Sequence, residues 1–226
     1  MPVIDDIREA RESIKSKGFK YQLKYYVHYY KWHVIIGIIL VLFTFSLIKS
    51  IVTKKDVAFE AIFVNSHQAP EVTEFAEKIN VDLTKFAVIF DTTYDIHPAE
   101  EYADQLSFVN SQKLMANLSI GEIDSLVCDK STAEYLKNQQ FYADLEDIFG
   151  TDFVKEMNDQ GKILYLNYED GETGEVFPPF PVGIDISDSN LIKENTDYDG
   201  SEPVYVTFVM GRDNLDNLKA FYEYIK

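Results

Sequence analysis

An apolar run over residues 32–52 constrains this chain more than any other feature. The run reads WHVIIGIILVLFTFSLIKSIV, and its one charged residue is Lys49. Because Trp32 and Lys49 can reach the interface from either side, it covers the roughly 20 residues that a bilayer-spanning helix needs. The sequence therefore predicts a single transmembrane helix, preceded by a tail at 1–31 and followed by a domain at 56–226.

The tail has the composition of a membrane-interface segment. Residues 3–17 predict a weakly amphipathic helix that stops at Gly18, with a frayed tail as the open alternative. Residues 19–33 interleave tyrosine, tryptophan and lysine, and such aromatic rings gather at the membrane–water boundary. Two interpretations stay open: an interfacial anchor, or a surface that recognises anionic lipid or a partner helix.

Lysines around the apolar run indicate its orientation. Those before it are Lys15, Lys17, Lys20, Lys24 and Lys31, and those at or after its end are Lys49, Lys54 and Lys55. The excess on the N-terminal side favours a cytoplasmic N-terminus and an extracytoplasmic C-terminal domain in a cell membrane. No A-x-A-like site follows the run, so an uncleaved signal-anchor is predicted rather than a cleaved signal peptide.

Charge and cysteine usage exclude several function classes. Residues 1–55 contain ten Lys/Arg and four Asp/Glu, whereas residues 56–226 contain eleven and thirty-four, giving net charges of +6 and −23. Phosphate backbones repel so acidic a domain, which argues against nucleic-acid binding. The single cysteine, Cys128, leaves no intramolecular disulfide and no paired thiols for a zinc site.

Periodicity along the domain predicts alternating strands and helices. The expected strands are 56–66, 85–91, 123–129, 163–168, 182–187 and 204–210, with helical patterns over 71–80, 99–120, 131–149, 151–160 and 214–225. This order favours an α/β domain with a mixed or mostly parallel sheet covered by helices on both faces.

Local signals refine these boundaries. Residues 92–98 form a polar connection, and the helix that follows is expected to break near Asn110. Ser131 and Glu134 predict a capping box, and Thr151 a further helix cap. The PPFP run at 178–181 excludes a central strand and predicts an edge or a crossover there.

Two stretches resemble bacterial extracellular solute-binding proteins with the type 2 periplasmic-binding fold. The first is residues 111–149, where a helix ends in the turn Ile120-Gly121-Glu122-Ile123-Asp124 and is followed by Ala133-Glu134-Tyr135-Leu136 and Phe141-Tyr142-Ala143-Asp144-Leu145. The second is residues 211–225, and the anchor at 25–36 is similar to those of uncharacterised single-span surface proteins of Gram-positive-type bacteria. The resemblance implies one α/β lobe. A two-lobed binding protein needs about twice this domain length, so an inter-lobe cleft is not expected.

No catalytic, cofactor-binding or metal-binding residue emerges from the motifs. Candidate bases in the domain are His67 and His97, and Cys128 sits in an apolar strand, where a core role is expected. The carboxylate pairs Glu100/Glu101 and Glu146/Asp147 are typical of a solvated acidic surface. The sequence therefore favours a protein that is not an enzyme.

Residues 195–200 match the N-x-D-x-D-G start of a calcium loop. Val206 stands where such a loop needs a bidentate glutamate, inside an expected strand. An Asx-rich turn is the favoured interpretation, with calcium binding as the open alternative.

The resulting hypothesis is a membrane-anchored extracytoplasmic binding domain for a small solute or a surface protein. Ligand-facing loops are expected at 92–97 and 129–132, because open α/β sheets bind at the carboxyl ends of their strands. The alternative is a regulatory or assembly subunit of a membrane complex, in which the tail and the transmembrane helix make the key contacts. Because the second lobe of a solute-binding protein is missing, a surface protein is favoured over a small solute.

Overall fold

The structure is a computed structural model that describes residues 18–53, 55–97, 105–169 and 173–226. The chain divides into two compact units, residues 1–54 and 55–226, which are described separately. The helix expected over 3–17, and the start of the one expected from Ala99, lie outside the described residues.

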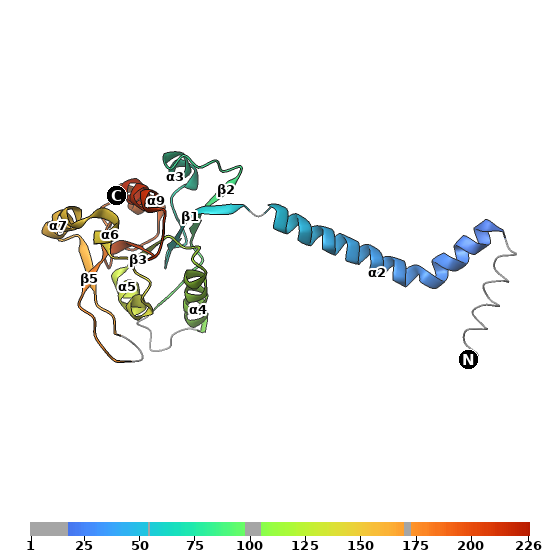
Figure 1. The fold of residues 1–226 in the computed structure, drawn as a ribbon, viewed down its shortest axis with the longest axis horizontal. Helices are drawn as coiled ribbons and strands as arrows, with labels where there is room; N and C mark the ends of the chain where they lie inside the picture. The colour runs from blue at the N-terminus through green and yellow to red at the C-terminus, as the bar shows by residue number, and fades with distance from the viewer. Residues whose placement is uncertain (1–17, 54, 98–104, 170–172) are drawn as a thin grey trace. The chain divides into compact units, whose positions relative to one another are not determined.

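In the described part of the first unit, the helix α2 runs from Phe19 to Thr53 (Figure 1). Within it, the 20 residues Tyr30–Lys49 have a mean hydropathy of 2.1, and none of the stretch is buried. This window is a candidate membrane span by length and composition. The helix begins well before the apolar run, because the aromatic and lysine-rich segment that precedes the run belongs to the same helix.

The second unit, residues 55–226, is an α/β domain around one six-stranded sheet. Its strands are β1 (Asp56–Phe63), β2 (Phe86–Asp91), β3 (Ser125–Asp129), β4 (Ile163–Leu166), β5 (Phe180–Asp185) and β6 (Val204–Phe208). They lie in the order β2-β1-β3-β6-β5-β4. The pairs β1–β2 and β1–β3 are parallel, and the other three pairs are antiparallel. The expectation of a mixed sheet is confirmed, whereas a mostly parallel one is wrong, because the chain adds its last three strands as antiparallel neighbours.

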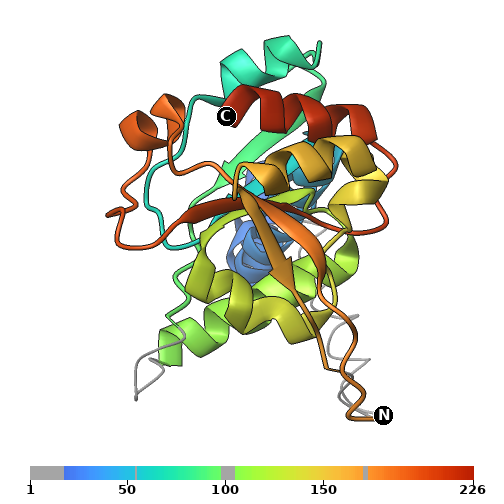
Figure 2. The ribbon, with the colours of Figure 1, turned by 90° about the vertical axis from the view of Figure 1, so that its left-hand side faces the viewer.

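Helices cover both faces of the sheet (Figure 2). They are α3 (Val72–Lys78), α4 (Gln105–Ile120), α5 (Lys130–Leu136), the 3-10 turn η1 (Lys137–Gln139), α6 (Leu145–Phe149), α7 (Thr151–Asp159), α8 (Asn190–Asn195) and α9 (Leu215–Ile225). The helices α3, α6, α7 and α9 lie over one face, and α4 and α5 lie over the other.

Alternation along β1 divides the core between these two faces. Phe59 and Phe63 belong to one buried cluster, and Ile62 and Val64 belong to the other. In the first cluster the Phe59 ring centroid lies 4.9 Å from that of Phe75 on α3. Because successive side chains point to opposite faces and helices cover both faces, apolar residues occur at both sets of positions along this strand.

Two expected helix starts are corrected. The N-cap of α5 is Asp129, whose carboxylate accepts from the backbone N–H of Thr132 at 2.7 Å, while Ser131 lies inside the helix and donates to that carboxylate. Asp129 is the N-cap because it ends β3 in an extended conformation, from which its side chain reaches the first turn of α5. Likewise Gly150, and not Thr151, precedes α7.

Other boundaries also differ from the sequence pattern. Of the helical stretch expected over 141–149, only α6 is helical, because residues 141–143 pair with the end of β6. The polar connection after β2 carries two fully buried side chains, Tyr94 and Ile96. The helix α4 continues through Asn110, whose amide donates to the Asp95 carbonyl instead of breaking the helix.

Candidate functional site

The sheet has two chemically different ends. Because β6 is antiparallel to β3, Asp129 at the end of β3 faces Val204 at the start of β6, and Ser125 faces Phe208 at its end. Two hollows lie at these opposite ends. One, of about 310 Å³, is lined mainly by polar side chains, and the other, of about 490 Å³, mainly by aromatic and aliphatic ones.

The larger hollow opens where the sheet splits. The strand β6 pairs with β5 as far as Thr207, but at Val209 its partner is Tyr142. The Phe208 carbonyl accepts from Ala143 N–H at 2.8 Å, and Met210 N–H donates to the Phe141 carbonyl at 2.8 Å. Residues 141–143 thus take the place beside β6 that β5 leaves.

The PPFP run leads into β5 at this split. The expectation of an edge or crossover is wrong, since β5 lies between β4 and β6 and includes Phe180 and Pro181. Pro181 pairs with Tyr165 just beyond a register shift in β4, at a point where the ladder is already irregular. A proline can enter an inner strand there because no regular ladder hydrogen bond is lost.

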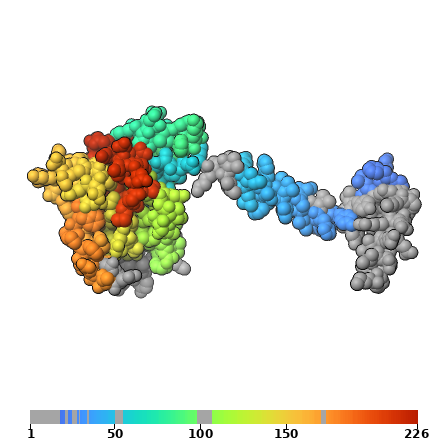
Figure 3. All heavy atoms as spheres, in the orientation of Figure 1, coloured from blue at the N-terminus to red at the C-terminus, as the bar shows by residue number. Residues whose placement is uncertain are grey.

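We refer to the larger hollow as the aromatic pocket. Its lining comes from the start of α6, the β4–β5 connection, the segment after β6 and the start of α9: Tyr142, Ala143, Asp144, Asp147, Ile148, Tyr168, Phe177, Pro178, Phe180, Val209, Met210, Gly211, Arg212, Leu215 and Leu218. The β4–β5 region and the C-terminal segment adjoin at the domain surface (Figure 3).

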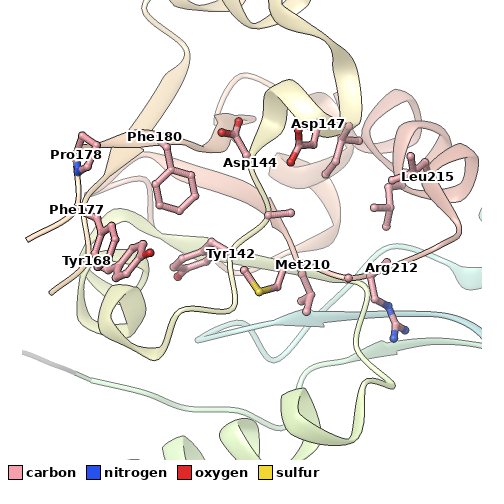
Figure 4. A pocket seen from close by; sticks show the side chains of 15 residues that line it. Tyr142, Asp144, Asp147, Tyr168, Phe177, Pro178, Phe180, Met210, Arg212 and Leu215 are labelled. Carbon is pink, nitrogen blue, oxygen red and sulfur yellow. The ribbon is translucent and has the colours of Figure 1, made fainter. Parts of the chain in front are cut away.

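Aromatic rings form one wall of the aromatic pocket. The Tyr168 ring stacks on Phe177 with a centroid distance of 4.4 Å, and it stands at 88° to the Phe180 ring at 6.2 Å. Figure 4 places these rings on one side and Leu215 on the other, with Asp144 and Asp147 along a third. The arrangement offers ring faces together with carboxylates, a combination that accommodates an apolar group with a polar or charged end.

The charged side chains of the described lining are Asp144, Asp147 and Arg212. Asp144 caps α6 by accepting from Glu146 N–H at 2.8 Å, which leaves its second carboxylate oxygen available. The Arg212 guanidinium turns away from the pocket (Figure 4) and donates to the carboxylate of Asp124 at 2.7 Å. The pocket therefore presents negative rather than positive charge.

Asp124 holds together the wall that carries Arg212. It is 1% exposed and accepts hydrogen bonds from Arg212, from Asn214 at 3.1 Å and from Glu60 N–H at 2.9 Å. Arg212 also donates to the carbonyls of Gly121 and Glu122. A buried carboxylate is tolerable here because several donors replace its water shell.

The neighbouring Glu60 is a buried carboxyl in an acidic environment. Burial raises its pKa most, and the negative charges of Asp91, Glu122 and Asp124 raise it further, against a lowering effect of Arg212. Ionisation of Glu60 in the folded protein is therefore costly.

The opposite end of the sheet, here termed the polar end, contains the two loops expected from the sequence to face a ligand. His97 from the loop after β2 and Asp129 from the end of β3 line the same hollow. Asn65, which follows β1, joins them: its side-chain amide donates to the Ile96 carbonyl at 2.8 Å and to Asp129 at 3.2 Å, and its carbonyl accepts from Ile96 N–H at 2.6 Å. Asn65 adopts the left-handed conformation, with φ of 61°.

A loop from α8 to β6 closes the polar end. Tyr198 places its hydroxyl 2.8 Å from the carbonyls of both Val64 and Val127, and its burial raises the phenol pKa well above the usual value. Asp197 accepts from Ser66 Oγ at 2.7 Å and from His67 N–H at 2.8 Å, contacts that lower its carboxyl pKa. The polar groups of this end are thus largely used to hold its own loops.

The metal and nucleophile candidates have structural roles. Asp199 accepts from Ser201 N–H at 2.8 Å, as in an Asx turn, and Asp197 is engaged as described. Within the described parts of the chain, no group of three or more His, Cys, Asp or Glu side chains could hold a metal ion. Cys128 is buried, and burial raises its thiol pKa far above the usual range, which suits a core residue and not a nucleophile.

Sequence reasoning missed the aromatic pocket. Its residues come from four separate segments, and Asp147 was interpreted as solvated surface. The available signal was the concentration of aromatic residues and prolines over 168–180, which follows no helical or strand periodicity. In comparisons with known proteins, no family model, no curated protein and no solved structure matches this chain. The resemblance of residues 111–149 to solute-binding proteins therefore stays a prediction.

Proposed function

We propose that this protein is a membrane-anchored, non-enzymatic binding protein, with its N-terminus in the cytoplasm and residues 56–226 outside the cell membrane. The aromatic pocket is the main support for this proposal, because its volume of about 490 Å³ lies within the range of known ligand sites. A protein partner is favoured over a free solute. The described residues form one sheet with one lobe, so no second lobe is available among them to close over a small molecule.

Membrane topology is tested with cysteine labelling in intact cells. Cys128 is buried and gives a low background, so a Ser201→Cys variant reports on the domain and a Lys20→Cys variant on the tail. A membrane-impermeant maleimide should label the first in intact cells and the second only after permeabilisation. The reverse pattern would overturn the proposed orientation.

Binding at the pocket is tested by ¹³C-methyl NMR of methionines on the full chain in maltoside micelles. The Met210 methyl lies in the pocket lining, whereas Met157 lies on α7 outside it. Peptide and fragment mixtures should shift the Met210 signal and leave that of Met157 in place. A library that shifts neither signal, at millimolar concentration, would argue against a binding pocket.

A second candidate function, a subunit of a membrane complex, is favoured by the length of α2. Its 35 residues measure about 52 Å, well beyond the hydrocarbon core of about 30 Å, so the helix extends beyond the core through a segment rich in lysine and tyrosine. Replacing residues 1–53 with an unrelated signal-anchor tests this. Loss of partner association would favour the subunit, and retention would favour the binding domain.

A further inference from the structure

We infer that the aromatic pocket takes a lysine or arginine side chain from a basic segment of a protein partner. The inference rests on the proposed binding function and names the chemistry of its ligand. Three observations support it: the geometry of the aromatic rings, the charge of the lining, and the length of the groove that the aromatic pocket forms with a smaller adjoining hollow.

Three aromatic rings lie together in the lining. Tyr168 and Phe180 form an edge-to-face pair at 88° with centroids 6.2 Å apart, and Phe177 stacks on Tyr168 at 4.4 Å. Ring faces are negative, so a cationic group within about 6 Å of them is attracted. The aliphatic stem of lysine or arginine packs on the apolar lining while its charged end stays at the rim.

The charge of the lining selects a cation over an anion. Asp144 and Asp147 stand at the rim, whereas Arg212, the basic side chain of the described lining, is turned toward Asp124 and two carbonyls (Figure 4). The whole domain carries a net charge of −23, which steers a basic partner toward it.

The groove is longer than one side chain. A smaller hollow of about 140 Å³ shares Tyr142, Tyr168, Phe180 and Met210 with the aromatic pocket and extends it toward Lys137. A free amine would leave much of this surface uncovered, while a chain segment covers it with neighbouring side chains. Lys137 at the far end of the smaller hollow repels a cation. The basic side chain of the bound segment is therefore expected at the other end, near Asp144 and Asp147.

The test uses the full chain in maltoside micelles and a peptide labelled with fluorescein at its N-terminus, fluorescein-Gly-Leu-Lys-Leu-Arg-Leu-Gly-amide. A matched peptide carries norleucine and citrulline in place of lysine and arginine. Fluorescence anisotropy at 0.15 M salt should give a Kd about tenfold lower for the basic peptide, as expected for a cation placed between rings and carboxylates.

The decisive variant is Asp144→Asn with Asp147→Asn. Asparagine also caps helices, so α6 is retained, and the basic peptide should lose about tenfold in affinity. The control, Asp152→Asn with Asp159→Asn, removes the same charge from exposed positions on α7 and should change the Kd less than about twofold.

The other outcomes overturn the inference in distinguishable ways. Equal losses in both double variants would show that only the overall charge matters. Butylammonium competing as tightly as the peptide would identify a small cation as the occupant. If the neutral peptide binds equally well and Tyr168→Leu weakens it, the cation preference fails and the proposed pocket function survives. If neither peptide binds and the Met210 signal never shifts, both fail.

Discussion

The two ends of the sheet are stabilised in different ways. At the polar end, the loops that follow β1, β2 and β3 are connected by hydrogen bonds that Asn65 and Tyr198 donate and that the Asp129 carboxylate accepts in part. At the aromatic pocket, the loop after β6 is held mainly through the buried Asp124 carboxylate, which accepts from both Arg212 and Asn214. The polar groups of the polar end mainly form hydrogen bonds with one another. The aromatic pocket instead presents two carboxylates and several aromatic rings to a partner.

The comparison indicates that the polar end mainly stabilises the fold, whereas the aromatic pocket is the end suited to binding. At the polar end, each single substitution should therefore lower the free energy of unfolding only modestly. At the pocket wall, removal of the buried Asp124 carboxylate should lower it much more. Substitutions at the two ends test this contrast, with stability measured by urea unfolding of the full chain in maltoside micelles and followed by tyrosine near-UV circular dichroism.

The largest effect is expected for Asp124→Ala. Removing this carboxylate leaves Arg212 without its buried partner and Glu60 N–H without its acceptor, so the free energy of unfolding should fall by about 3–5 kcal/mol. Asp188→Ala is the control, because its pair with Lys193 is exposed and should contribute less than about 1 kcal/mol. Similar losses in both variants would contradict the view that one buried pair holds the pocket wall.

At the polar end, Asn65→Ala should lower the free energy of unfolding by about 2–3 kcal/mol, because it strands buried partners of the Asn65 amide. It also places a Cβ-bearing residue without a local hydrogen bond at a φ of 61°. Asn65→Gly loses the same hydrogen bonds but tolerates this φ, and should therefore be less destabilised than the alanine variant. Equal stability of the two variants would show that the left-handed backbone is not part of the cost.

The sequence predicted the parts of this molecule that depend on local pattern. The apolar run and most elements follow from periodicity, and the loops at 92–97 and 129–132 do converge on one hollow. It failed where a distant segment decides the local structure. Residues 141–143 look helical but pair with β6, and PPFP enters an inner strand because β6 changes its partner there. Such a pairing depends on contacts between residues about 65 apart, which no local pattern records.

A smaller loss is expected for Tyr198→Phe, which removes the hydroxyl that bonds the ends of β1 and β3. At neutral pH the variant should be about 1 kcal/mol less stable. Burial raises the folded-state pKa of Tyr198 above the unfolded value near 10, so the stabilisation is complete below pH 10. As the pH rises above 10, the unfolded phenol ionises first and the advantage of the wild-type protein should shrink. An advantage that is constant between pH 8 and pH 11 would refute the assignment.

The smallest effect is a gain, and it returns to the pocket end. Glu60→Gln should stabilise the protein at pH 7 by under about 1 kcal/mol, because the wild-type carboxyl must ionise in a buried and acidic environment. The folded-state pKa of Glu60 lies above its ordinary 4.5, so its ionisation lowers stability as the pH rises through the folded value.

The sign of the pH dependence separates this cause from a general loss of negative charge. Below about pH 4 the wild-type carboxyl is protonated in both states, and the difference from Glu60→Gln should vanish. Glu156→Gln on α7 removes the same charge from an exposed position and should leave stability nearly unchanged at pH 7. If that control stabilises as much as Glu60→Gln does, the gain comes from the net charge of the domain. If only Glu60→Gln stabilises, the pocket end carries a local electrostatic cost next to the Asp124–Arg212 ion pair.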